Sequence, residues 1–240
     1  NPKGDQQELI PWTGLRNFLD DVVKAINEVT AIRDSWVNAL IGGATFGSML
    51  ALGVVWGPNF LMAAGMEQKD AFFTSSMMWA GLAIGAPICA WLSDQIQSRK
   101  RPMFAGALLQ FITITLIISQ PGMSATEANV YFFIWGFMAG ASMLNFPIGA
   151  ELVKPELTGT SAAIVNAVQF IVGGIIMAIP GRVLDGKGFI ARVAQIETEA
   201  PSTVNDYQWA MVIIPIVLAV ALVLFMFLRE TFPKNEREME

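Results

Sequence analysis

The feature that most constrains this chain is a set of six long stretches in which no Asp, Glu, Lys or Arg occurs. Each is long enough for a helix to cross the hydrocarbon core of a bilayer, which needs about 20 apolar residues. Inside hydrocarbon every backbone N–H and C=O must be paired within the protein, so only helices or closed barrels can span it. Barrel strands alternate apolar and polar residues, whereas these stretches are apolar on all sides and predict helices. The six predicted spans are Ser35–Met66, Ala71–Leu92, Pro102–Thr126, Ala128–Ala150, Leu157–Gly181 and Tyr207–Leu228.

Composition excludes several classes of protein. Apolar residues make up 54% of the 240 and charged residues 15%, against roughly 25% charged in a soluble domain of ordinary composition. The chain has no histidine and one cysteine, Cys89, so zinc, haem and iron–sulfur sites of the usual kinds are not expected, and we predict no metal and no cofactor. A net charge of −5 argues against nucleic acid as a partner. The sequence contains no recognisable nucleophile–base pair, which disfavours an enzyme.

The distribution of basic residues predicts the orientation. With six spans both termini lie on one side of the membrane, and 11 of the 15 Lys and Arg residues fall on that side. Cytoplasmic loops carry the excess of Lys and Arg in membrane proteins. We therefore predict a multi-pass protein of the cell's inner membrane with both termini in the cytoplasm. Residues 1–34 and 229–240 are then cytoplasmic, and residues 35–228 form the transmembrane domain.

The cytoplasmic segment before the first span contains a predicted amphipathic helix, Trp12–Thr30. Its apolar residues recur at helical spacing and form one face, while Asp20, Asp21, Lys24 and Glu28 lie away from that face. Such a helix can lie on the inner leaflet or pack beneath the bundle. We favour the position beneath the bundle, because the polar face carries charges of both signs rather than an excess of basic residues.

Glycine divides the spans into two groups. The first, second, fourth and fifth spans are rich in glycine, the third has only Gly106 before its outer end, and the sixth has none. Glycines four residues apart, as in Gly81–Gly85 and Gly136–Gly140, allow two helix backbones to approach closely. The glycine-poor spans are then expected to face lipid. Because every third span is glycine-poor, the pattern predicts two sets of three helices, a 3+3 internal repeat.

The loop between the second and third spans carries an acidic residue followed by a basic trio. A six-span bundle with both ends inside and this loop resembles one half of a Major Facilitator Superfamily transporter. The family's signature in this loop is a glycine, three residues, an acidic residue, a basic residue, then a glycine and a basic pair. Asp94, Arg99 and Lys100 agree with the signature, whereas Ala90, Gln95 and Gln97 depart from it.

The resemblance implies a fold, a function and partners. The family has twelve spans, so this chain looks like the carboxy-terminal half, with residues 1–34 as the loop that joins the halves. The implied partners are the amino-terminal six-helix half, a small-molecule substrate and membrane lipid. The implied function is secondary active transport, by alternating access, of a small polar or amphipathic solute such as an amino acid or an organic acid. The alternatives are a drug or metabolite exporter of the same superfamily and a membrane subunit of a larger complex.

In the resembled mechanism the signature loop latches the cytoplasmic ends of the helices in one state. Asp94 ends a span, where a carboxylate can accept hydrogen bonds from the first N–H groups of a neighbouring helix. Arg99 and Lys100 can pair with acidic partners or lipid head groups, or only set the topology. Glu151, at the cytoplasmic end of the fourth span, is a further latch candidate. No charge lies in the middle of a span, so any coupling residue is expected in the missing half.

Uncharged polar side chains near the middle of the spans are the candidate substrate contacts, because transporter sites lie near the bilayer midplane. Asn166 and Gln169 on the fifth span are three residues apart and are expected to share one face. Ser48 on the first span falls at a similar depth, and Asn145 lies about a turn nearer the cytoplasm. Buried amides are costly in lipid unless paired, so we expect these side chains to face the bundle interior. The alternative is that they only hydrogen-bond between helices.

Tryptophans and prolines mark the outer parts of the spans. Trp56, Trp79 and Trp135 lie in the outer third of their spans. Anchoring at the membrane interface explains tryptophans at this depth, and an aromatic gate or cavity wall is the alternative. Pro58 follows Trp56 closely and is expected to bend or break the outer end of the first span. Further bends are predicted at Pro87, Pro147, Pro180 and Pro215.

Overall fold

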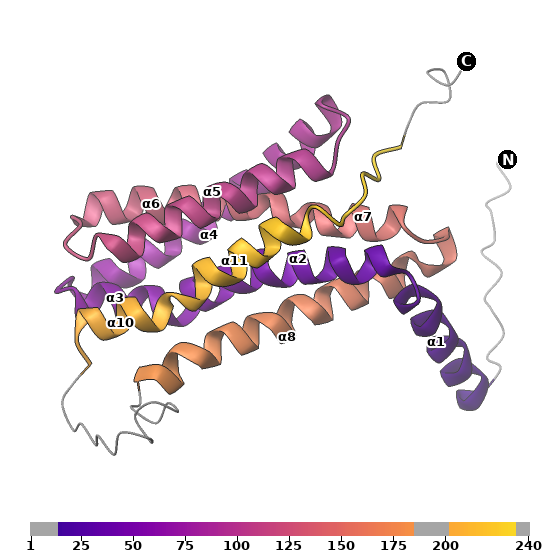
Figure 1. Cartoon of the computed structure of the whole chain (residues 1–240), viewed down its shortest axis with the longest axis horizontal. Helices are drawn as coiled ribbons and strands as arrows, with labels where there is room; N and C mark the ends of the chain where they lie inside the picture. The colour runs from indigo at the N-terminus through magenta and orange to yellow at the C-terminus, as the bar shows by residue number, and fades with distance from the viewer. Residues whose placement is uncertain (1–13, 185–201, 234–240) are drawn as a thin grey trace, which may run out of the picture.

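The structure, a computed structural model, describes residues 14–184 and 202–233, and six of its helical segments are long and apolar enough to cross a membrane (Figure 1). These segments overlap all six predicted spans, and no strand occurs within the two described ranges. The predicted all-α fold is therefore confirmed. Residues 1–13 and 234–240, which include the start of the predicted amphipathic helix and most of the predicted tail, lie outside the described residues.

Each span consists of one to three helical elements. Span one comprises α2 (Arg33–Leu50), the π-helix η1 (Ala51–Trp56) and α3 (Gly57–Ala63). Span two is α4 (Gln68–Gln95), and span three is α5 (Lys100–Ser119). Span four comprises α6 (Ala125–Ala139), the 3₁₀-helix η2 (Gly140–Leu144) and α7 (Asn145–Glu151). Span five comprises η3 (Pro155–Leu157) and α8 (Thr158–Leu184), span six comprises α10 (Val204–Met211) and α11 (Ile213–Leu224), and α1 (Leu15–Thr30) precedes span one.

Contacts between the spans repeat with the symmetry of two sets of three helices. Span two packs most closely against span four, and span one against span five. If spans one to three correspond to spans four to six, these two pairs are equivalent to each other. The contact of span three with span four is likewise equivalent to that of span six with span one, and both are present. The predicted 3+3 arrangement is therefore confirmed.

Glycine makes the two closest contacts possible. Gly85 in α4 lies so near the backbone of α6 that a Cβ at this position would overlap the carbonyl oxygen of Phe137. On α2, a Cβ added to Gly47 would lie 2.8 Å from backbone atoms of Gly173 in α8. In lipid, apolar side chains gain little by leaving the solvent, so close backbone contact of this kind contributes much of the helix association.

The exposure of the spans does not follow their glycine content. In the most apolar part of each span, 50% of the residues of span three are buried, against 33% in span two, 22% in span five and 28% in span six. Span three still exposes Leu108, Ile112 and Leu116 on one face, so its expected contact with lipid stays a prediction, and the lower burial of spans two and five has a separate cause. The physical reason is that α4 and α8 each bury one glycine-lined face and leave another face uncovered. The large apolar side chains on the uncovered faces include Phe72, Phe73 and Trp91 of α4 and Phe170, Ile171 and Ile175 of α8.

Spans one and four change helix type in their interior, and a proline follows each of these changes. In span one the π-helix η1 precedes Pro58, which has no N–H to donate to the preceding turn. The side-chain amide of Asn59 donates to the backbone oxygen of Val55, one turn earlier, at 2.9 Å. In span four Pro147 follows the 3₁₀-helix η2. The predicted interruption of span one is confirmed, whereas α4 and α8 continue through Pro87 and Pro180.

Helix α1 projects from one end of the bundle (Figure 1). Its contacts with α2 and α8 are sparse. The apolar side chains of Phe18, Leu19 and Val23 are about half exposed. The preferred position beneath the bundle is therefore wrong for the described chain, because the bundle leaves this apolar face uncovered. Its placement on the inner leaflet stays a prediction.

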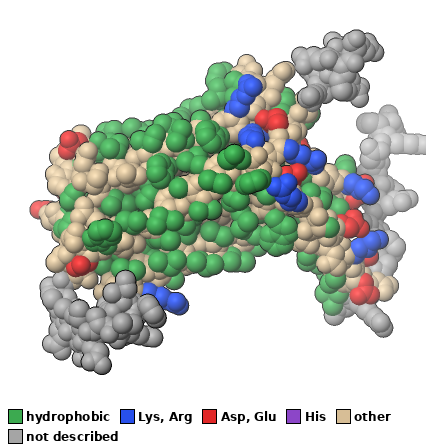
Figure 2. All heavy atoms as spheres, viewed as in Figure 1, with side chains coloured by type: hydrophobic (Ala, Val, Ile, Leu, Met, Phe, Trp, Pro, Cys, Tyr) green, Lys and Arg blue, Asp and Glu red, His purple; other side chains and the backbone are tan. Residues whose placement is uncertain are grey.

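The first and last described residues lie at the same end of the bundle (Figure 1). Lys and Arg side chains gather at this end and are sparse at the opposite one (Figure 2). We call it the basic end; it carries Arg99, Lys100, Lys154 and Arg229. This arrangement agrees with the predicted placement of both termini on one side of the membrane. That this side is the cytoplasm stays a prediction.

Replacing Gly85 by alanine is expected to lower the free energy of unfolding by about 1–3 kcal/mol, the usual cost of overpacking, because the new methyl group pushes α4 away from α6. The matched control is Gly174→Ala on α8, where an added Cβ meets no atom within 4 Å. We expect the control to keep the parent's stability or to raise it by up to about 1 kcal/mol, because alanine is more favourable than glycine inside a helix. Thermal unfolding of the purified chain in detergent compares the two, and equal melting temperatures would contradict the close contact.

Candidate functional site

Three amide side chains from three helices come together where α2, α7 and α8 meet. Asn38 of α2, Asn145 at the start of α7 and Gln169 of α8 are at most 1% exposed. Gly42, one turn after Asn38, allows the approach, because a Cβ there would lie 2.9 Å from both Asn145 Nδ2 and Gln169 Nε2. We call Asn38, Asn145 and Gln169 the amide cluster.

The amide cluster is only partly hydrogen-bonded. Asn38 Nδ2 donates to the backbone oxygen of Asn145 at 2.8 Å, and Asn145 Nδ2 donates to the backbone oxygen of Ser142 at 2.6 Å. Asn38 Oδ1, Asn145 Oδ1 and Gln169 Nε2 have no partner within the described chain. A buried polar atom without a partner costs about 1–3 kcal/mol, and few such atoms occur in folded proteins. The cluster can therefore accept hydrogen bonds at two atoms and donate from a third.

The structure separates the two amides predicted to share a face of span five. Gln169 is buried, as expected, whereas Asn166 is exposed. The expectation that both face the bundle interior is therefore wrong for Asn166. Positions three apart differ by about 60° around a helix, and the contact with α2 covers Gln169 without reaching Asn166. Ser48 of α2 is fully buried and its hydroxyl has no partner, so it adds a polar atom to the interior.

The three predicted tryptophans have different environments. The indole N–H of Trp135 donates to the backbone oxygen of Gln110 at 2.7 Å. That of Trp56 donates to the backbone oxygen of Met177 at 2.9 Å. Both side chains are buried and each joins two spans, so anchoring at the membrane interface is the wrong explanation for them. Trp79 is 39% exposed on α4 and stays a candidate for a cavity wall.

A second group of polar side chains surrounds Arg99 at the basic end. The Arg99 guanidinium lies 2.7 Å from the carboxylate of Asp94 and 3.0 Å from that of Glu151. The side chains of Arg99 and Glu151 are 15% and 17% exposed, whereas that of Asp94 is 61% exposed. Burial by itself lowers the pKa of Arg99, but the hydrogen bonds to Asp94 and Glu151 outweigh it and raise the pKa. Arg99 therefore stays charged, and its better-shielded pair with Glu151 joins the α4–α5 loop to the end of α7.

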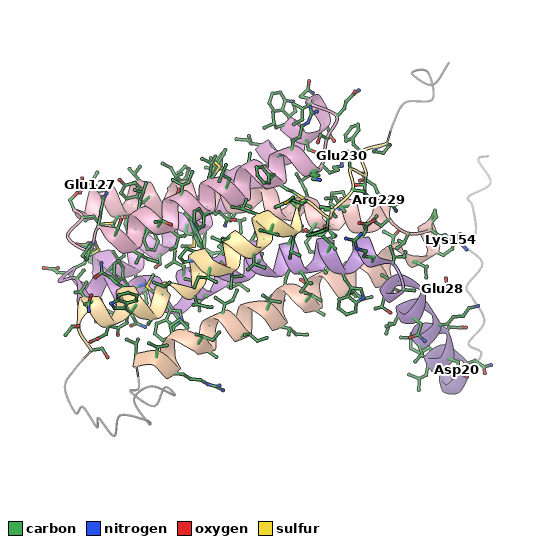
Figure 3. All side chains as sticks on the ribbon, viewed as in Figure 1. Asp20, Glu28, Glu127, Lys154, Arg229 and Glu230 are labelled. Carbon is green, nitrogen blue, oxygen red and sulfur yellow. The ribbon has the colours of Figure 1, made fainter. Side chains whose placement is uncertain are left out.

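The sequence predicted that Asp94 binds the first N–H groups of a neighbouring helix. This prediction is wrong, because a different carboxylate occupies that position. Glu230 accepts from the backbone N–H of Arg99 at 2.8 Å and of Lys100 at 3.3 Å, at the start of α5. Figure 3 shows Glu230 at the basic end, near the start of α5. The Lys100 Nζ donates to the carbonyl oxygen of Leu228 at 2.7 Å, so its observed partner is a backbone group.

The α4–α5 loop turns through a residue in the left-handed region. Gln97 has a φ of 50° and is the only described non-glycine residue with a positive φ. The family signature places a glycine here. The left-handed conformation costs a non-glycine residue about 1–2 kcal/mol. The loop therefore keeps the turn that a glycine favours although its sequence departs from the signature.

Three residues of these two groups could not be recognised from the sequence. Asn38 lies near the end of its span, so its depth gives no reason to select it as a substrate contact. The signal that could have indicated it is Gly42, one turn later, which marks a close approach of neighbouring helices. Ser98 and Glu230 form their contacts through the turn of the α4–α5 loop. The pairing of Glu230 with Arg99 bridges 131 residues of sequence, so no local pattern marks it.

Replacing Gln97 by glycine is expected to raise the free energy of unfolding by about 1 kcal/mol, because glycine adopts a positive φ without steric cost. The matched control is Gln95→Gly, two residues earlier at the end of α4, which should lower it by about 0.5–1 kcal/mol. Thermal unfolding in detergent measures both. A lower melting temperature for Gln97→Gly would show that the loop carries no backbone strain there.

Comparison with known proteins agrees with the helix arrangement and the loop. A sequence model of the Major Facilitator Superfamily matches residues 2–178. The choline/ethanolamine transporter flvcr2a of Danio rerio is 27% identical over 113 residues, which are 45% of this chain and 23% of that protein. The chain thus spans less than a quarter of this relative's length. Because the family match covers more than half of a chain with six membrane-length helices, this chain belongs to the Major Facilitator Superfamily.

Proposed function

We propose that this chain is the carboxy-terminal half of a secondary transporter that moves a small polar or amphipathic solute across the cell's inner membrane by alternating access. The observation that carries the proposal is the amide cluster, which places partnerless polar atoms inside a bundle of this family. Transporters of this kind bind their substrates near the bilayer midplane, at the interface of their repeats. The basic end is the cytoplasmic side by the positive-inside rule.

The chemistry of the amide cluster supports a solute with several hydrogen-bonding groups. Asn38 Oδ1 and Asn145 Oδ1 accept from ammonium or hydroxyl groups, and Gln169 Nε2 donates to hydroxyl or carboxylate oxygens. Amino acids carry such groups. So does ethanolamine, one of the two solutes in the name of the Danio rerio relative, whereas choline, the other, has a hydroxyl but no N–H to donate. A charged solute takes its counter-charge from the other half or from aromatic faces, because the middle of each described span is uncharged.

The uncovered faces of α4 and α8 support an amino-terminal six-helix half as the partner. Trp79 of α4 and Phe170 of α8 are 39% and 55% exposed. Spans two and five are equivalent in the 3+3 arrangement, so a partner with the same arrangement can cover both. The substrate cavity then lies between the halves, with the exposed Asn166 of α8 on its wall, whereas the amide cluster, at most 1% exposed, is closed off from it in the present state.

The network around Arg99 supports a latch at the cytoplasmic end. Arg99 holds Asp94 at the end of span two and Glu151 at the end of span four. Lys100 holds the segment after span six through Leu228. These contacts keep the cytoplasmic ends of the helices together in the present state, and the ends separate when the latch releases.

Uptake into proteoliposomes that hold this chain together with its amino-terminal half tests the proposal. Labelled amino acids, organic acids and amino alcohols are offered in turn, and we expect saturable uptake of one class. Gln169→Met should raise the KM about tenfold or more without loss of stability, because it removes a ligand donor that has no partner in the protein. Ile112→Met, on the exposed face of α5 and away from the amide cluster, is the control and should change neither quantity. Full-strength substrate binding by this chain alone would contradict the proposal, since its cavity lacks one wall.

A separate measurement addresses ion coupling. We expect Glu151→Gln to keep proton-coupled uptake, because Glu151 is bound by Arg99 and Thr231 at a helix end and the coupling residue belongs to the other half. Uptake driven by an imposed pH gradient is compared with uptake without the gradient. Complete loss of coupling, with folding and substrate binding unchanged, is the outcome that would place the coupling residue in this chain.

A further inference from the structure

The residues directly after span six bind four other parts of the basic end. Lys100 Nζ donates to the carbonyl oxygen of Leu228. Arg229 Nε lies 3.2 Å from the Asp34 carboxylate at the start of α2. We call the segment Leu228–Phe232 the clasp. Its contacts with α2, the α4–α5 loop, α5 and α7 connect the ends of four spans.

Glu230 of the clasp caps the first two N–H groups at the start of α5. Helix α5 has no side-chain cap of its own at Arg99, and the nearby Ser98 hydroxyl accepts only from the N–H of Arg101. The Glu230 carboxylate accepts from the N–H groups of Arg99 and Lys100 and from the hydroxyl of Ser98. The first N–H groups of a helix carry a partial positive charge, and hydrogen bonds to a carboxylate are stronger than neutral ones. The start of span three is therefore satisfied by a side chain that follows span six.

Two further clasp residues contact Arg99 and its partner Glu151. The hydroxyl of Thr231 donates to Glu151 Oε2 at 2.6 Å, while Arg99 Nε binds Glu151 Oε1 at 3.0 Å. The ring of Phe232 covers the guanidinium of Arg99, with 4.7 Å from its central carbon to the ring centroid. A guanidinium over an aromatic face is attracted by the ring's quadrupole. Arg99 and Glu151 are thus both fixed by residues of the clasp.

We propose that the clasp takes part in the conformational change of the transporter. In the closed latch it positions Arg99 and Glu151, and its release uncaps α5 and frees the α4–α5 loop. Glu230, Thr231 and Phe232 are positioning residues, because they act on Arg99 and Glu151 and lie away from the amide cluster. The role in transport rests on the function proposed above. The capping of α5 by Glu230 does not depend on that function.

Ionisation of Glu230 supports a clasp that is closed at neutral pH. Burial opposes the charge of Glu230, but hydrogen bonds from Ser98 and from the N–H groups of Arg99, Phe232 and Lys100 outweigh it and lower the pKa below its ordinary value. A lowered folded-state pKa means that the stabilisation is complete above the ordinary value and disappears as the pH falls through the lowered one. The other charged groups of this region are Arg33, Asp34, Asp94, Arg99, Lys100, Arg101, Glu151 and Arg229.

Hydrogen–deuterium exchange of the full chain in detergent tests the cap directly, because Arg99 and Lys100 donate their amide hydrogens to Glu230. We expect exchange of these amides to accelerate about tenfold in Glu230→Gln, which keeps an acceptor but loses the charge, and more in Glu230→Ala. Glu156→Gln is the matched control, since Glu156 is an exposed acid at the same end. Unchanged exchange at Arg99 and Lys100 in both Glu230 variants would overturn the proposal.

Two further measurements separate the cap from a general loss of structure. Thr231→Val removes the hydrogen bond to Glu151 but keeps the side chain's shape, so the amides of α5 should stay protected. Lowering the pH should speed their exchange in the parent chain, after correction for the intrinsic rate, and should have a much smaller effect in Glu230→Gln. An equal acid response in both chains would contradict the role of the Glu230 carboxylate.

Transport by the two halves together then distinguishes the clasp from the proposed function. Glu230→Gln is expected to change the maximal uptake rate several-fold and to leave the KM unchanged, because Glu230 does not contact the amide cluster. If no solute is taken up but exchange responds as expected, the proposed function fails and the cap of α5 stands. If uptake is present but the maximal rate is the same in Glu230→Gln, the clasp has no part in transport.

Discussion

The bundle depends on the direct approach of helix backbones at glycine. In lipid the apolar side chains of a helix are as well solvated by the bilayer as by another helix, so close contact has to supply the association. Gly85 brings α4 onto α6, and Gly47 brings α2 onto α8. The same approach places the amide cluster, because Gly42 lies on α2 one turn before the Gly47 region and touches Asn145 and Gln169. A side chain at Gly42 would separate the three helices that form the cluster.

Polar groups are sorted by depth according to their cost in the membrane. The middle of the described bundle holds amides and hydroxyls, whose burial costs far less than that of a charge. Charged groups lie at the ends, where Arg99, Glu151 and Glu230 have both partners and access to water. The interior can therefore select a ligand by hydrogen bonding, whereas the ends respond to salt and pH. Under the proposed function, recognition and latching are carried by different chemistry.

The sequence allowed the spans and their repeat to be predicted because hydrocarbon imposes one strong rule on every residue of a span. It did not show which face of a span meets another. Gln169 and Asn166 both carry an amide side chain, and only the tertiary contact of Gln169 with α2 distinguishes their environments. Glu230 was missed for a related reason, since its partners lie 131 residues earlier and meet it only after folding. Gln97 shows the opposite case, where the family signature indicated a turn that the residue itself disfavours.

The two ends of the bundle are held together by different interactions. Spans one and four are equivalent in the repeat, yet span one is interrupted by a π-helix towards its outer end and span four by a 3₁₀-helix nearer the basic end. The outer interruption is held by uncharged hydrogen bonds, from Asn59 within span one and from Trp56 to span five. The basic end is held by ion pairs and a charged cap. Salt screens exposed charges and leaves buried pairs and neutral hydrogen bonds almost unaffected. Ionic strength therefore acts on the basic end, through the more exposed pairs of Arg99 with Asp94 and of Arg229 with Asp34 rather than through the shielded pair of Arg99 with Glu151.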